Sequence, residues 1–555
     1  MGNVGGASWR PCQNIYLTHA VWGASWRPLQ FLLLFLLSLP CFAARVEIRE
    51  GRFYVDNEPF YVRGIGYAPW RPHQHPGISY TDTNRRWTQL DFERMKAAHF
   101  NTIRTWDALD PEELALANQN GLMVLQGIWL DPKQDFSDPH NQQAAIDQVQ
   151  AVAEKSKTFD NVLGYLIMTE PNPEAVLDTG TEETMQYFRR LKRAIQSVDP
   201  RPVSMDSWPP LAFMDYHDFD FVTFNLFAFW PKSIIHAMGL AGMTRWMADH
   251  VAADKPLIIG ETGGYAVSEA SQTAAGGFGG LTEYSQSLKD LESLRAVLEG
   301  HAFGSVLVSW IDTWHYPRDP DTHDNEPWEW DGVLAIPTDS EKDEVGIPRQ
   351  IYKDVSTYNQ LIPVEPKTNH IYPIAQPVPI QVNAPDDVIH VRYTVNDGDW
   401  KYLDGSGHGW FQGFFKLPKL AKKRQTMNFQ ALDKDETVLA TKEVSFLAGV
   451  LEESVTIEIK GTGRGAKALE FSVKLEDSLH HPLTQRKVYY GCFFPISFGE
   501  ARGTLTTNDS GQGTFTCQTT PEPHDRYIFV AAGTDRPEHV RTSDLRIFKL
   551  GHTTP

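Results

Sequence analysis

Two glutamates in this chain directly follow apolar runs that are typical of buried strands. Glu170 ends the string LIMTE, and Glu261 ends the string LIIGE. A carboxylate placed after a buried run carries a desolvation cost, so a simple surface role explains it poorly. Two carboxyl groups across one cleft can serve as proton donor and nucleophile, which is the pair that glycoside hydrolysis requires. The alternative for such a pair is a structural ion-pair network.

The elements around these acids alternate between short apolar strands and amphipathic helices, from Arg45 to about Leu361. Eight such repeats predict an α/β fold, a closed (β/α)8 TIM barrel over residues 45–362, with a doubly wound open sheet as the alternative. The barrel is favoured because no Gly-rich phosphate turn follows the first strand. In a barrel, the active site lies at the carboxyl ends of the strands. The predicted strands are 62–65, 101–106, 121–126, 162–168, 203–206, 219–224, 256–260 and 305–310, and the predicted helices include 90–99, 142–157, 182–197, 244–252 and 284–300.

Five strings, in order, carry a family resemblance over residues 52 to about 361: RGIGYAPW, DFERMKAAHFNTIRTW, GYLIMTEPNP, LIIGETGGY and SVLVSWIDTW. The chain resembles the clan A retaining glycoside hydrolases, including families 2 and 5, and also the β-1,3-glucan glucanosyltransferases. The resemblance implies that Glu170, after strand four, is the acid/base and that Glu261, after strand seven, is the nucleophile. It implies a double displacement that needs no cofactor.

The same resemblance implies roles for the residues around the pair. Arg104, ending strand two, would bond the nucleophile and keep it ionised. Trp310, ending strand eight, would form the floor of the sugar subsite. The chain departs from the family pattern at Thr169, where Asn is usual, and at Asn225, near which a Tyr is usual. Both positions are candidate substrate-binding residues.

Aromatic residues are frequent near the strand ends, and the chain has 16 Trp. Sugar rings stack on aromatic faces, so some of these side chains are expected to contact a glycan and the rest to pack. Asp206, ending strand five, would contact substrate hydroxyls or cap a loop. The string Asn325-Glu326-Pro327 imitates the acid/base string but lies in a predicted loop. The aromatic candidates for substrate binding are Tyr67, Trp106, Trp208 and Phe227, with Trp230 nearby.

Beyond a Pro-rich stretch from Pro363 to Pro379, apolar residues alternate with polar ones. This pattern predicts two small all-β, immunoglobulin-like sandwiches at 370–449 and 450–555. Cys492 and Cys517 are expected to form one disulfide, with two free thiols as the alternative. Five aromatics in this part could form a glycan-binding face, although core packing is favoured: Trp400, Trp410, Phe411, Phe414 and Phe415.

The first 44 residues contain the apolar run LQFLLLFLLSL followed by small residues, which predicts a signal peptide with cleavage near Ala43 or Ala44. The mature chain is therefore expected to be secreted, periplasmic or at the cell surface, with no membrane insertion. The net charge of −19 makes nucleic acid a poor partner. A carbohydrate substrate is the expected partner.

Together these features predict an exported retaining β-glycosidase that acts on a poly- or oligosaccharide. One alternative is a transglycosylase that remodels a β-glucan-type polysaccharide. The other is a catalytically silent polysaccharide-binding protein, which the unusual Thr169 and Asn225 favour and which the presence of both glutamates and Arg104 disfavours.

Overall fold

A computed structural model of the chain describes residues 46–74, 82–267, 278–314, 319–324, 326–374, 376–418, 423–461, 468–517, 526–535 and 541–550. The predicted leader, residues 1–44, lies outside the described residues. Within these ranges, no helix combines the length and the apolar character needed to cross a membrane.

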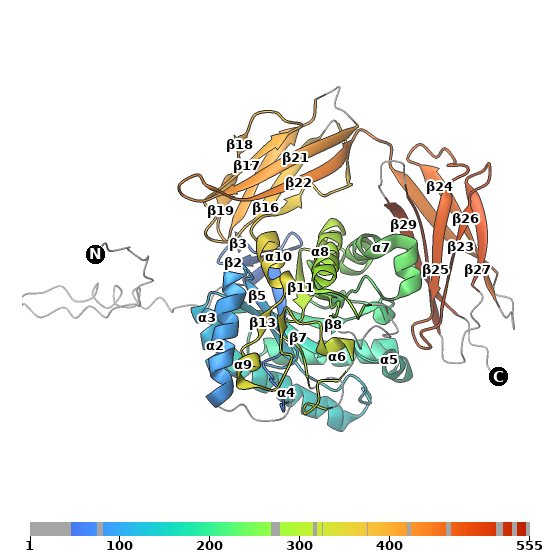
Figure 1. Cartoon of the computed structure of the whole chain (residues 1–555). Coiled ribbons are helices and arrows are strands. Elements are labelled where there is room, and N and C mark those ends of the chain that lie inside the picture. Colours follow the sequence, from blue (N-terminus) through green and yellow to red (C-terminus); the bar gives the residue numbers. More distant parts are fainter. Residues whose placement is uncertain are drawn as a thin grey trace, which may run out of the picture. The chain divides into compact units, whose positions relative to one another are not determined.

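The centre of the fold is a closed barrel of eight strands in the order β10-β11-β4-β5-β6-β7-β8-β9, all of whose pairings are parallel (Figure 1). This confirms the predicted (β/α)8 barrel. All eight strands are buried along their whole length or in all but one residue, as expected when helices cover a parallel sheet. The strands are β4 (Val62–Tyr67), β5 (Thr102–Thr105), β6 (Met123–Ile128), β7 (Val162–Thr169), β8 (Val203–Ser207), β9 (Val222–Asn225), β10 (Leu257–Gly263) and β11 (Gly304–Val308).

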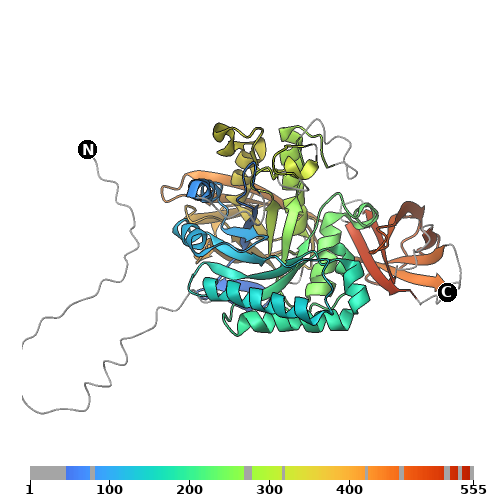
Figure 2. The ribbon, with the colours of Figure 1, turned by 90° about the horizontal axis from the view of Figure 1, so that it is seen from below.

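Helices pack around the outside of these strands (Figure 2). The α3 helix shows how local sequence sets a start: Asp110 accepts hydrogen bonds from the amides of Glu112 and Glu113, and Pro111 occupies the first turn. The helices are α2 (Asp82–Ala97), α3 (Pro111–Gln119), α4 (Pro139–Ser156), α5 (Pro173–Thr179), α6 (Thr181–Gln196), α7 (Lys232–Met247), α8 (Glu283–Glu299), α9 (Glu341–Glu344) and α10 (Gln350–Asn359), with short turns η1 (Pro209–Leu211), η2 (Ala248–Ala252) and η4 (Pro327–Glu329).

The α7 helix is the clearest departure from the predicted helices, because it begins at Lys232 rather than at Thr244. Its first turns contain Gly239 and a nearly continuous apolar run, so they lack the one-sided periodicity from which a helix is predicted. The structure explains this composition, since α7 packs against the barrel and also against strands β25, β28 and β29.

A small sheet closes the amino-terminal end of the barrel. It consists of β1 (Val46–Arg49), β2 (Arg52–Val55) and β3 (Glu58–Pro59). Phe53 of this sheet lies edge-on to Phe221 at 5.1 Å between ring centroids, and both are buried. The opposite, carboxyl end of the barrel is therefore the end that remains available for a site.

The C-terminal part forms two pairs of sheets, each pair around its own apolar core, which confirms the predicted sandwiches. The strand pairings are antiparallel except for that of the short strand Ile371–Tyr372, which is parallel. The Cys492–Cys517 disulfide joins the two sheets of the second sandwich. The strands of the first are β14 (Ile362–Glu365), β15 (Ile371–Tyr372), β16 (Pro377–Asn383), β17 (His390–Val395), β18 (Lys401–Tyr402), β19 (Asp404–Ser406), β20 (Trp410–Lys416), β21 (Arg424–Leu432) and β22 (Val438–Ala448); those of the second are β23 (Glu453–Gly461), β24 (Leu469–Asp477), β25 (Lys487–Phe493), β26 (Glu500–Thr506), β27 (Gln512–Cys517), β28 (Tyr527–Asp535) and β29 (Arg541–Lys549). A further pair, β12 (Leu334–Ala335) and β13 (Ile347–Pro348), lies in the loop after the barrel.

The Pro-rich stretch from Pro363 to Pro379 is not simply a linker, because β14 and part of β16 lie within it. Strand β14 pairs with β16 only at residues 381–383. Beside Pro377 and Pro379, β16 has a single neighbour, β20, so prolines are tolerated there as they are on sheet edges.

Candidate active site

The end of β7 turns Glu170 into the barrel mouth through an irregular backbone. The pairing of β7 with β8 shifts register between Ile167 and Thr169, and both Met168 and Glu170 have positive φ, 55° and 51°. The amide of Glu170 donates to the carbonyl of Asp206 at 2.8 Å. Bulges of this kind re-aim a side chain at the rim of a barrel, so the local backbone positions this carboxyl group.

The end of β10 contains a second bulge, which positions Glu261. The pairing of β10 with β9 shifts register between Ile259 and Glu261, so that Glu261 lies opposite Asn225. Gly260 occupies the bulge, and a Cβ there would lie 2.5 Å from Asp206 Oδ1 and 2.9 Å from Asn225 Oδ1. Only glycine allows these two polar side chains to approach the strand so closely.

Two donors bind the same oxygen of Glu261. Arg104 Nη2 lies 2.9 Å from Oε1, and Trp106 Nε1 donates to Oε1 at 2.8 Å. The Arg104 guanidinium also lies over the Trp106 ring, 4.3 Å from its centroid. Burial raises the pKa of Glu261 to about 7, while the charge of Arg104 opposes this rise. Both donors therefore favour the ionised form of Glu261.

A third carboxylate, Asp206, shares Arg104 with Glu261. Asp206 Oδ2 pairs with Arg104 Nη2, and both side chains are fully buried. Thr169 accepts a long hydrogen bond of 3.4 Å from the same nitrogen. Burial raises the pKa of Asp206, and Arg104 opposes that rise. Asp206 thus contacts the guanidinium rather than an exposed cleft, so it is a positioning residue for Arg104.

Glu170 has a weaker set of partners than Glu261. Asn225 Nδ2 donates to Glu170 Oε1 at 3.0 Å. Burial raises the pKa of Glu170 to about 8, the negative charge of Glu261 adds to the rise, and the Asn225 hydrogen bond opposes it. The two carboxyl groups consequently differ: Glu170 holds its proton more firmly than Glu261 does, the condition for an acid and a nucleophile in one site.

The aromatic candidates divide between the cleft and the core. Trp106 bonds Glu261, Trp208 is partly exposed and donates through Nε1 to the Pro171 carbonyl at 3.0 Å, and Phe227 is nearly buried 6.2 Å from Trp328. Sequence reasoning did not find the ion pair of Asp206, because that contact depends on which strands become neighbours in the closed barrel.

Two predicted substrate contacts are wrong. Trp310 is 0% exposed and packs between Phe100 and Tyr352, with ring centroids at 6.4 and 6.1 Å. Tyr67 is 1% exposed, and its hydroxyl lies 3.3 Å from a carboxylate oxygen of Asp91. Both rings point outward from the barrel wall into the helix layer, and position along the chain alone does not say on which side of the wall a side chain lies.

The five aromatics of the first sandwich divide between core and surface: Phe415 is partly buried and Trp400 is 39% exposed. Trp410 and Phe411 are buried, whereas Phe414 is 74% exposed. The Asn325-Glu326-Pro327 string leads into the short turn η4, with Glu326 exposed; Asn325 lies outside the described residues. Glu326 is thus on no barrel strand.

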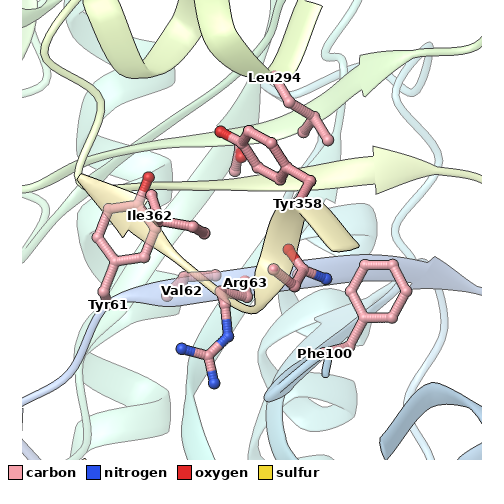
Figure 3. Close-up of a pocket in the computed structure, with 10 residues that line it drawn as sticks. Tyr61, Val62, Arg63, Phe100, Leu294, Tyr358 and Ile362 are labelled. Atoms are coloured by element: carbon pink, nitrogen blue, oxygen red, sulfur yellow. The ribbon is translucent and has the colours of Figure 1, made fainter. Parts of the chain in front are cut away.

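A small pocket lies at the opposite, amino-terminal ends of β4 and β11 (Figure 3). Its lining includes Arg63, whose side chain already donates to the carbonyl of His99 at 3.0 Å and bonds Asn383. Burial lowers the pKa of Arg63 to about 10. This pocket is separate from the carboxylate pair. Among the described residues, no three His, Cys, Asp or Glu side chains gather as a metal site requires.

A barrel with two differently tuned carboxylic acids at its carboxyl end defines the class of the glycoside hydrolases. The family model described as "Glycosyl hydrolases family 2, TIM barrel domain" matches residues 46–328. The chain belongs to glycosyl hydrolase family 2. No curated protein matches the chain.

Solved structures with a similar fold include three β-glucuronidases. Apo β-glucuronidase 3 of Bacteroides uniformis is 13% identical, with 91% of this chain and 65% of that chain covered and a TM-score of 0.43. The Ruminococcus gnavus enzyme in complex with D-glucuronic acid is 17% identical, covering 56% and 51%, with a TM-score of 0.44. The Dictyoglomus thermophilum β-D-glucuronidase is 17% identical, covering 56% and 53%, with a TM-score of 0.45. The chain thus spans less than two thirds of the length of each.

Proposed function

We propose that this chain cleaves a β-glycosidic bond with retention, through Glu261 as nucleophile and Glu170 as acid and then base. The observation that carries the proposal is the placing of Arg104 and Trp106 on the same oxygen, Oε1, of Glu261. This arrangement favours the ionised form of Glu261 and leaves Oε2 to face the anomeric carbon of a bound sugar.

In the first displacement, Glu261 Oε2 forms a bond to the anomeric carbon as the bond to the leaving oxygen breaks. Glu170 gives its proton to that oxygen, which leaves as an alcohol. In the second, water attacks the anomeric carbon, its proton passes to Glu170, and the ester to Glu261 breaks. The charge of Glu261 raises the pKa of Glu170, and ester formation removes that charge. The pKa of Glu170 therefore falls once the ester has formed, and Glu170 is then a carboxylate that can act as the base in the second step.

The sugar in this site is proposed to be uncharged rather than a uronate. Three carboxyl groups, those of Glu170, Glu261 and Asp206, surround one guanidinium, Arg104. Arg104 is already shared by two of these acids, so it is a poor partner for a fourth carboxylate. A sugar carboxylate placed here would be repelled by these carboxyl groups, and Arg104, which is already paired with Asp206 and Glu261, would not offset that repulsion.

The test is turnover of a panel of 4-nitrophenyl β-glycosides: glucoside, galactoside, mannoside and glucuronide. Wild type is compared with Glu170→Gln, Glu261→Gln and a control, Glu326→Gln, whose carboxylate is exposed. We expect one or more neutral glycosides to be cleaved, with the β-anomer as first product, and activity to be lost only in the first two variants. Activity that survives Glu261→Gln would overturn the nucleophile, and preferential cleavage of the glucuronide would overturn the neutral sugar.

We also propose that the mature chain is exported. The apolar run at residues 29–39 and the Cys492–Cys517 disulfide both support this, because disulfides persist in oxidising compartments. Mass spectrometry of the protein from fractionated cells is expected to show an N-terminus near residue 44 and a mass lower than that of the dithiol by two hydrogen atoms. A full-length, reduced protein in the cytosolic fraction would refute the proposal.

A further inference from the structure

Three aromatic side chains from two domains gather near the acid/base. Trp208, which follows β8, stacks on Trp230, which follows β9, at 5.5 Å between centroids and an interplanar angle of 22°. Phe498, from the loop between β25 and β26 of the second sandwich, lies 5.8 Å from Trp208 and 5.9 Å from Trp230. Both indoles are partly exposed, and Phe498 is 45% exposed. We call Trp208, Trp230 and Phe498 the aromatic platform.

The platform is tied to Glu170 by two hydrogen bonds. Trp208 Nε1 donates to the carbonyl of Pro171, the residue directly after Glu170, at 3.0 Å. The amide of Glu170 in turn donates at 2.8 Å to the carbonyl of Asp206, two residues before Trp208. The platform therefore begins on the side of the site where the proton donor lies.

The loop that carries Phe498 is held against the barrel. Glu500 accepts hydrogen bonds from the amides of Lys232 and Ser233, at the start of α7. The amide of Phe494 donates to the carbonyl of Gly499 at 2.9 Å, which closes the loop, and Phe498 adopts a positive φ of 55°. A non-glycine residue rarely adopts this conformation, so the surrounding contacts hold it there.

Packing between the domains does not require an exposed Phe498. The same region already holds aromatic contacts between the domains: Phe493 is 0% exposed and lies 5.5 Å from Trp230, and the partly buried Phe213 and Tyr527 stack at 4.3 Å and 6°. A ring that served only adhesion would be buried like Phe493. Nearly half of the surface of Phe498 instead remains accessible to a ligand.

We propose that the aromatic platform binds the sugar on the leaving-group side of the scissile bond, so that the second sandwich supplies part of the substrate site. This inference rests on the proposed function, because Glu170 protonates the leaving oxygen and the departing sugar must lie beside it. The hydrophobic CH faces of a neutral pyranose fit against aromatic rings.

The test compares two substrates that share one β-linked sugar: a disaccharide and the β-glycosyl azide, whose leaving group has no ring. The sugar is whichever of glucose, galactose or mannose wild type cleaves. Phe498→Leu keeps an apolar side chain and removes the ring, and Phe498→Tyr restores it. Phe414→Leu removes an exposed ring of the first sandwich and is the matched control.

We expect Phe498→Leu to lower kcat/KM on the disaccharide by roughly fivefold to tenfold, which corresponds to about 1–1.4 kcal/mol, a usual value for one aromatic contact. On the azide the change is expected to stay within twofold. Phe498→Tyr and Phe414→Leu are expected to behave as wild type on both. An equal loss on disaccharide and azide, or no loss on either, would overturn the platform.

A second measurement tests the aromatic platform independently of whether the chain hydrolyses any glycoside. Retardation in native gels cast with barley β-glucan, galactomannan or arabinogalactan needs no turnover. If no glycoside is cleaved, the proposed function fails, and the gels decide the platform alone. Stronger retardation of wild type than of Phe498→Leu in one gel supports the platform, and equal mobility in all of them refutes it.

Discussion

The Asp206→Asn substitution tests the electrostatic organisation of the site. It keeps the shape of the side chain and removes one negative charge from the buried group formed by Arg104, Glu261 and Asp206. The side chains of Arg104 and Asp206 are 0% exposed, and that of Glu261 is 11% exposed. Little solvent is available to screen the change.

The negative charge of Asp206 raises the pKa of both Glu261 and Glu170, so its removal lowers both. Asp206 and Glu261 both contact Arg104 Nη2. For two charges roughly 5 Å apart, an effective dielectric constant of about 20 gives about 3.3 kcal/mol, or roughly two and a half pKa units, as an upper value. Side-chain relaxation reduces this, and we expect about one unit. The acid limb of kcat/KM reports ionisation of Glu261 and the basic limb protonation of Glu170, so both limbs move to lower pH.

The assay is the pH profile of kcat/KM on the 4-nitrophenyl β-glycoside that wild type cleaves. The matched control is Asp199→Asn, which removes another buried carboxylate paired with an arginine, Arg201 at 3.0 Å, at the start of β8. We expect the control to lower the melting temperature without moving either limb. An Asp206→Asn profile with unmoved limbs, or limbs displaced to higher pH, would refute the assignment of Asp206 as the partner of Arg104.

Three further outcomes are expected. Trp106→Phe removes a donor to Glu261, so the acid limb moves to higher pH and kcat/KM falls by about tenfold, which steady-state kinetics would show. Gly260→Ala places a Cβ 2.5 Å from Asp206 Oδ1, and we expect lost turnover with a lower melting temperature; an active, equally stable variant contradicts the close approach. Cys492→Ser opens a disulfide with a sequence separation of 25, and denaturant titration should show a loss of about 3 kcal/mol in the second sandwich.

Local pattern was enough to predict the barrel, and it pointed to Glu170 and Glu261 as the candidate pair of acids. Strands β7 and β10 contain short apolar runs, and Glu170 and Glu261 stand where these two runs stop. These features depend on neighbours in sequence and on the rule that parallel strands end at one face. The α7 helix was predicted too short because its burial on two sides, by the barrel and by β25, β28 and β29, removes the polar face that periodicity requires.

The direction in which a side chain points was beyond such reasoning. Trp310 and Trp208 both follow strand ends, yet the first packs in the helix layer and the second lies partly exposed near Glu170. The same limit applied to Asp206. Its ion pair with Arg104 joins β8 to β5, two strands that are not neighbours in the sheet, and the two side chains meet only because the sheet closes into a barrel. Successive side chains of a strand point to opposite faces of the barrel wall, so a shift of one residue decides whether a side chain faces the helix layer or the barrel interior.

The amino-acid order alone indicated the strand–helix alternation and the change to all-β sheets after the barrel, because both follow from the local spacing of apolar residues. It also indicated the two glutamates, because each directly follows an apolar run. Tertiary structure alone decided which charges share a guanidinium, how the pKa values of Glu170 and Glu261 differ, and that Phe498 reaches Trp208 across a domain boundary. These depend on distances between segments remote in sequence, and electrostatic energy and ring stacking vary with distance rather than with position along the chain.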